Sequence, residues 1–87
     1  MAIIDIHHIQ LAMPPGEEES ARFFYIGILG FEETPKPSNL VQRGGVWFRS
    51  NSVHLHLGIE VDFRPAKKAH PAFVVDDLKT IEKTQAL

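Results

Sequence analysis

Residues 52–75, SVHLHLGIEVDFRPAKKAHPAFVV, decide how the rest of the chain is interpreted, because they carry three of its five histidines. Apolar and polar residues alternate from 53 to 60, which predicts a strand with one buried face. The opposite face of that strand carries His54, His56, Gly58 and Glu60. A further strand is predicted over residues 70–75, beginning with His70. The polar residues 61–69, broken by Pro65, are predicted to form a connector between the two strands.

The start of the chain holds the other two histidines. Residues 2–13, AIIDIHHIQLAM, predict a strand. Because side chains alternate along a strand, His8 and Gln10 are expected on one face, and His7 on the other with Ile9 and the apolar residues that follow it.

The segment between these stretches predicts one helix and two short strands. Three glutamates at 17–19 favour a helix start, and apolar residues at helical spacing extend it from Ala21 to Leu29. Gly30 is expected to end this helix in a left-handed conformation. Strands are predicted over 31–34 and 46–49, on either side of a proline-marked loop at 35–43. The turn at 50–52 joins the strand at 46–49 to the strand at 53–60 as a hairpin.

The end of the chain repeats its beginning. Placing His70 on His8 also aligns Leu11 with Phe73, and residues 76–87 then predict a second helix that starts at Asp76. We therefore expect a complete module at 1–60, a connector at 61–69 and the start of an incomplete second module at 70–87.

Composition narrows the classes of function. A chain of 87 residues is enough for one small domain, and the absence of cysteine excludes disulfides and thiolate metal sites. A net charge of -2 without a basic patch favours neither nucleic acid nor a membrane surface as partner. The sequence contains no membrane-length apolar run and no signal-peptide pattern. We expect a soluble, cytoplasmic protein that binds a small-molecule substrate.

Histidines on several strands are what a divalent first-row metal requires in a protein without cysteine. A single histidine on an amphipathic strand is more often packed or solvated than a metal ligand. Three of them, on strands that a repeat would bring around one cleft, favour the metal site over that simpler interpretation.

Two motifs resemble those of the vicinal oxygen chelate superfamily, which includes glyoxalase I, extradiol dioxygenases and bleomycin resistance proteins. HIQLAM followed by ARFFYIGILGF resembles the opening of its first module, and HPAFVVDDL resembles the entry of its second. The resemblance implies an α+β fold, in which a βαβββ module of the glyoxalase/bleomycin resistance/dioxygenase type is followed by the first strand and helix of a second module.

The resemblance also implies one divalent ion, Fe(II), Mn(II), Ni(II), Co(II) or Zn(II), in the cleft of the sheet. Carried over by position, its ligands are His8, His56 and His70. The remaining family ligand, a glutamate near the end of the second module, has no counterpart before Leu87. His54 lies two residues from His56 on the same face and is the alternative ligand on that strand.

Four further side chains are candidates for substrate binding. Gln10 shares a face with His8 and either lines the pocket or hydrogen-bonds within it. Trp47 is either a core residue or a stacking surface for the substrate. His54 is either a group that faces the substrate or a surface residue, and Arg64 either binds a substrate anion or belongs to a solvated connector.

The family resemblance implies a metal-dependent lyase of the glyoxalase type or an extradiol-type dioxygenase, in which the metal binds neighbouring oxygens of a small substrate. The alternative is a non-catalytic, bleomycin-type binding protein that uses the same cleft without a metal. The exposed edge of a half-built sheet further predicts a homodimer.

Overall fold

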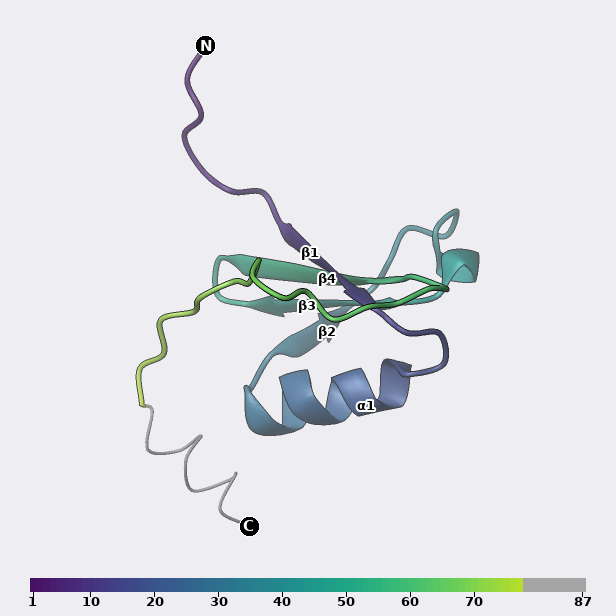
Figure 1. Cartoon of the computed structure of the whole chain (residues 1–87). Helices are drawn as coiled ribbons and strands as arrows, with labels where there is room; N and C mark the ends of the chain where they lie inside the picture. The colour runs from purple at the N-terminus through teal and green to yellow at the C-terminus, as the bar shows by residue number, and fades with distance from the viewer. Residues whose placement is uncertain (78–87) are drawn as a thin grey trace.

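The computed structural model describes residues 1–77, which form a four-stranded sheet with a helix along one face (Figure 1). In chain order the elements are β1 (Ile9–Met13), α1 (Glu18–Arg22), a π-helical stretch (Phe23–Ile28), β2 (Glu32–Thr34), a 3-10 turn (Val41–Arg43), β3 (Val46–Ser50) and β4 (Val53–Ile59). The strands lie in the order β1-β4-β3-β2, with β1 parallel to β4 and the other pairs antiparallel. The predicted α+β fold, its βαβββ order and the β3–β4 hairpin are confirmed.

The core lies between the sheet and the helix. Phe48 and Leu55 are fully buried at its centre, on adjacent strands where they pair directly. The other buried residues are Met13, Phe31, Val46 and Leu57. Tyr25 packs from the helical segment onto this cluster, with its ring centroid 5.3 Å from that of Phe48. The alternation predicted for β4 therefore holds, since its apolar residues face the helix.

The predicted helix is α-helical only in its first part. From Phe23 the backbone widens into π-helical geometry, in which the Leu29 amide donates to the Phe24 carbonyl at 3.0 Å, five residues back. Gly27 lies within this stretch, and glycine weakens a regular α-helix. Gly30 ends it with a φ of 78°, as predicted. The wide turn leaves Phe23 71% exposed, so this residue does not belong to the packed face.

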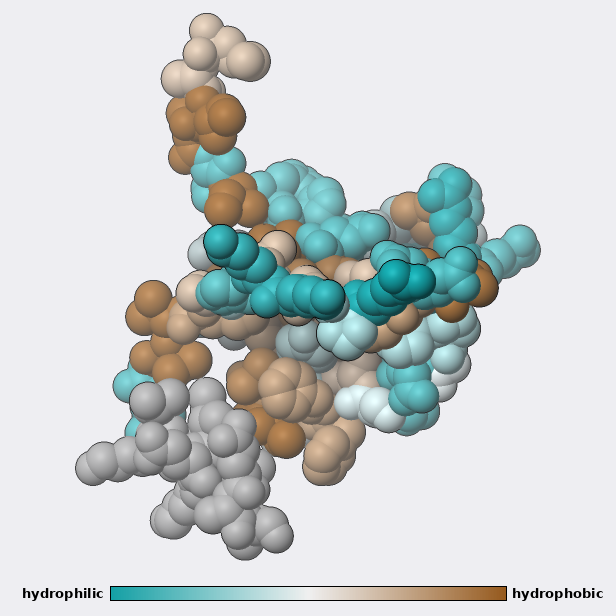
Figure 2. Space-filling model, in the orientation of Figure 1, coloured by the Kyte–Doolittle hydropathy of each residue, from teal (hydrophilic) through white to brown (hydrophobic). Residues whose placement is uncertain are grey.

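β1 is shorter than the predicted strand, because residues 2–8 form no ladder. Ile9 pairs with Leu55, and β4 begins at Val53, only two residues earlier. Most of residues 2–8 would therefore have no residue of β4 to pair with. The N-terminal residues instead project from the sheet (Figure 1). Figure 2 shows hydrophobic side chains along this projection, where Met1, Ile3 and Ile4 are at least 90% exposed.

The strand predicted over residues 70–75 is wrong, because the structure contains no regular element there. A strand needs a hydrogen-bonded neighbour; residues 70–75 pair with no strand of the described chain, and Pro71 has no amide to donate. Phe73 nevertheless packs against the core, with its ring centroid 5.9 Å from that of Phe31. Most of the helix predicted over 76–87 lies outside the described residues. No helix within residues 1–77 is long and apolar enough to cross a membrane.

Gly45 marks the closest backbone approach between the loop before β3 and strand β4. Its φ is 84°, and a Cβ placed on it would lie 2.2 Å from the carbonyl oxygen of Leu57. Gly16 has a similar φ of 79° but open space around it. A side chain at Gly16 would therefore suffer the strain of the left-handed backbone but would meet no neighbouring atom.

We expect Gly45→Ala to lower the free energy of unfolding by about 2 kcal/mol or more, because strand and loop must separate. The matched Gly16→Ala variant carries only the cost of a left-handed alanine, about 1 kcal/mol. Urea denaturation of both variants measures the difference. Equal losses would contradict the proposed contact between Gly45 and the Leu57 carbonyl.

Candidate functional site

The sheet face opposite the helix carries the polar and aromatic side chains that the sequence analysis identified. Strand register places Gln10, His56, Trp47 and Thr34 in one row across all four strands. Gln10 pairs with His56 in the parallel ladder, and His56 pairs with Trp47 in the antiparallel one. Because directly paired residues project to the same side of a sheet, this row forms the centre of the face that the helix leaves uncovered.

Three aromatic rings form a stack on this face. The rings of Trp47 and His56 are nearly parallel, with centroids 3.8 Å apart and 3° between their planes. The ring of His8 covers the other side of His56 at 4.3 Å and 17°. His8 directly precedes β1. If the parallel register of β1 with β4 continued one residue before the Ile9–Leu55 pair, His8 would lie opposite His54. Its ring therefore reaches diagonally to His56, which brings two of the three predicted ligands together.

The stack sets the protonation state of His56. Burial between its neighbours lowers the pKa of the His56 imidazole below its usual value, and the charges that His8, His54 and His7 would carry if protonated lower it further. A neutral imidazole is the form that binds a metal ion. His56 is therefore held in the ligand-competent form around neutral pH.

The donor chemistry of His8 and His56 fits a divalent metal ion, but the two rings do not yet converge on one point. Their lone pairs lie in nearly parallel planes, so sharing one ion requires one ring to turn. Within residues 1–77, no group of three or more histidine, aspartate or glutamate side chains is arranged to hold a metal ion. The described residues thus bring together two of the donors that such a site needs.

His70 lies outside this pair, on the exposed segment after the connector. Its Nδ1 lies 2.7 Å from the carbonyl oxygen of Lys68. Because a carbonyl can only accept, Nδ1 carries a proton, and in the neutral tautomer of the ring Nε2 keeps its lone pair. This is the arrangement in which a histidine offers Nε2 to a metal. Its assignment as a ligand stays a prediction.

The remaining predicted residues occupy different places. His7 contacts His8, with 2.9 Å between their Nδ1 atoms, so it lies closer to the pair than its predicted opposite face suggested. His54 is exposed on the same face as His56 and stacks on no ring in the described chain. Arg64 is exposed in the connector and makes no hydrogen bond or ion pair within residues 1–77. The substrate-binding roles of His54 and Arg64 stay predictions.

A cavity of about 220 Å³ adjoins the row of site residues. Gln10, Trp47 and Gly58 line it from the sheet, while Lys36 and Arg43 line it from the loop between β2 and β3. The sequence predicts this loop only as a connection between strands. The one available signal was a pair of cationic residues inside a segment bounded by proline and glycine, which is common in solvated loops.

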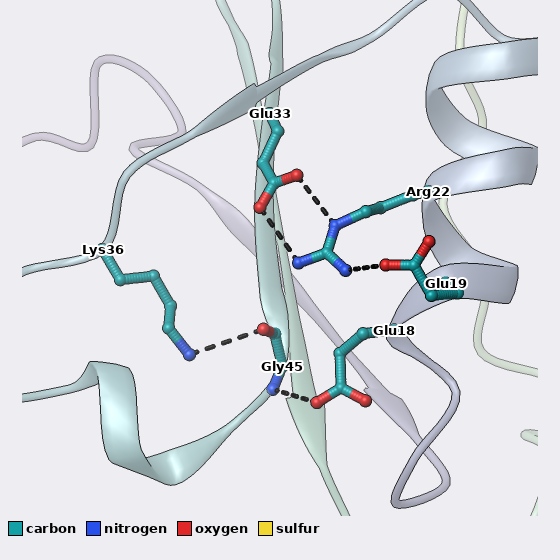
Figure 3. Close-up of polar contacts among 6 residues, drawn as sticks. All are labelled: Glu18, Glu19, Arg22, Glu33, Lys36 and Gly45. Carbon is teal, nitrogen blue, oxygen red and sulfur yellow. Dashed lines mark hydrogen bonds and ion pairs between the residues drawn. The ribbon is translucent and has the colours of Figure 1, made fainter.

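Polar contacts fix this loop against the rest of the module (Figure 3). The Lys36 ammonium donates to the carbonyl of Gly44 and, at 3.5 Å, to that of Gly45. The Gly45 amide donates to Glu18 Oε2 at 3.2 Å, which ties the loop to the start of α1. The wall of the cavity is therefore held by contacts with both the helix and the loop itself.

A second set of contacts in Figure 3 joins the helix to the sheet. Arg22 donates from Nε and Nη2 to the two carboxylate oxygens of Glu33, at 2.8 and 3.2 Å, and also pairs with Glu19. The hydrogen bond to Glu33 has the largest effect on the pKa of the Arg22 guanidinium, which it raises above its usual value, and the hydrogen bond to Glu19 raises it further. The bidentate pair holds α1 against β2, on the side of the sheet away from the cavity.

The chain resembles a solved structure in both sequence and fold. No protein-family model and no curated protein matches it. A crystal structure from Bacillus anthracis, described as that of a glyoxalase family protein, matches with a TM-score of 0.90 and 44% sequence identity. The match covers 98% of this chain and 73% of that one.

We expect the pKa of His56 to lie below 6.5, and Trp47→Ala to raise it by exposing the ring to water. An NMR titration of the imidazole protons measures both values. The folded protein disfavours protonation of His56, so the stability tied to its neutral form is present above pH 6.5 and is lost as the pH falls through the folded pKa. A His56 pKa at or above 6.5 would contradict the burial argument.

Proposed function

Because the chain belongs to the glyoxalase family, within the vicinal oxygen chelate superfamily, we propose that it is a metal-dependent enzyme whose substrate is a small oxygen-bearing molecule. The observation that carries this proposal is the stack of His8 and His56 beside Trp47, on the face that the helix leaves uncovered. A divalent ion there would supply Lewis-acid stabilisation to a substrate that presents two neighbouring oxygens.

The chain's own residues have distinct roles in this proposal. His8 and His56 hold the metal ion, and His70 supplies a third imidazole through its free Nε2. Trp47 stacks on His56 and lines the cavity, where its indole contacts the substrate. Gln10 lines the same cavity and contributes amide donors and an acceptor. A metal-dependent enzyme is favoured over a metal-free binding role because two imidazoles, His8 and His56, stack together on the uncovered face and the lowered pKa of His56 keeps its ring neutral.

His56 is preferred to His54 as the ligand of strand β4. His56 stacks on His8 and is partly buried, which positions its ring and keeps it neutral. His54 is exposed and lacks a ring neighbour within residues 1–77. Since the two lie on the same strand and the same face, they form a matched pair for testing.

We expect His56→Ala to weaken binding of Ni(II) or Zn(II) by more than about tenfold, since losing even an outer-shell partner of a ligand costs that much. His8→Ala and His70→Ala should have similar effects. Isothermal titration of metal-free protein with each ion measures the affinity, and elemental analysis of protein purified without an affinity tag measures the resident metal.

His54→Ala is the control and should leave metal affinity unchanged. If His54→Ala weakens binding as much as His56→Ala does, the ligand assignment on β4 is wrong. If the protein retains no metal and binds none on titration, the metal-dependent enzyme is excluded and a metal-free binding protein takes its place.

We also propose that the chain forms a homodimer. β1 is at the edge of the sheet and pairs only with β4 among the described strands, so the backbone groups on its outer side are open to another chain. Multi-angle light scattering should give twice the mass of one chain. A monomer at every concentration tested would contradict this.

A further inference from the structure

We propose that the cavity beside Trp47 binds a carboxylate group of the substrate, with Arg43 as its main counter-charge and Lys36 as a second donor. This inference rests on the proposed function, because it assigns the substrate class of the same sheet face. It predicts small organic acids as substrates, and neither cationic residue belongs to the proposed metal site.

The first support is the charge of the cavity lining. Lys36 and Arg43 both line it, and no aspartate or glutamate does. The Arg43 amide donates to the Leu40 carbonyl, but the Arg43 side chain makes no hydrogen bond or ion pair within residues 1–77. Its guanidinium is therefore free to bind an anion. A planar guanidinium matches a carboxylate with two parallel hydrogen bonds, which makes arginine well suited to this group.

Lys36 differs from Arg43 because it also serves the loop. Two of its contacts go to the carbonyls of Gly44 and Gly45, and an ammonium group has three protons to donate. Glu18 and Glu33 line an adjoining hollow together with Lys36, and Glu18 also accepts from the Gly45 amide. Lys36 is therefore partly compensated, and Arg43 carries the uncompensated charge.

The second support is the position and size of the cavity. Trp47 lines it and stacks on His56, so a molecule whose carboxylate meets Arg43 extends along the indole toward the histidine pair. A cavity of about 220 Å³ lies below the roughly 300–1,000 Å³ of sites for drug-sized ligands. The space therefore suits an acid of few atoms.

Benzoate and benzamide provide a matched pair of probes, because they share a ring and differ chiefly in charge. Trp47 is the only tryptophan of the chain, so its fluorescence reports directly on the cavity. We expect benzoate to bind the whole chain about tenfold more tightly than benzamide, which corresponds to one charge-assisted hydrogen-bonded contact. Arg43→Gln should reduce benzoate affinity to the level of benzamide, and Arg43→Lys should restore part of it.

Arg49→Gln is the control variant. Arg49 lies on the same face but outside the cavity, 3.6 Å from Glu32, so its loss should leave benzoate binding unchanged. Absence of benzoate binding, equal binding of both probes, or full benzoate affinity in Arg43→Gln would overturn the inference. None of these outcomes affects the metal titration of the histidine variants, so the two proposals fail separately.

Discussion

The parallel pairing of β1 with β4 is the constraint on which both the fold and the candidate site depend. It closes the sheet between segments more than forty residues apart and buries Leu55 and Leu57 beneath the helix. On the other face it sets Gln10 beside His56 and brings His8, which lies just before the strand, over the same ring. A shift of one residue would exchange the two faces, so the apolar pattern that secures the core also positions the imidazoles.

Much of the module could be predicted from local patterns. Alternation identified β4 and the face that carries its histidines, and Gly30 identified the end of the helix. Three features could not be found in this way. The π-helical geometry of Phe23–Ile28 has no signature in the spacing of apolar residues, which fits a regular helix equally well, and its Tyr25 packs against Phe48 of a distant strand. The late start of β1 depends on where β4 begins, and residues 70–75 lack a neighbouring strand in the described chain, however suitable their own pattern.

The candidate site also has parts that the sequence predicts and parts that depend on tertiary contacts. Alternation gave His8, Gln10 and His56 a defined face of their strands, and the family resemblance then selected His8 and His56 as ligands. The stacking of three rings could not be predicted, since it depends on a diagonal contact of His8 with His56 on the neighbouring strand β4. The cationic wall was missed for a different reason. Lys36 and Arg43 lie in a loop, where no periodicity indicates direction, and only the contacts of the double glycine fix its path.

The strand order also has a consequence during synthesis. β1 leaves the ribosome before β4 has been made, so its apolar face has no partner until almost the whole module has emerged. Parallel pairings between distant segments close late for the same reason of chain entropy. The nascent chain therefore exposes an unpaired, apolar strand, and the yield of folded protein depends on how quickly the β3–β4 hairpin pairs with that strand.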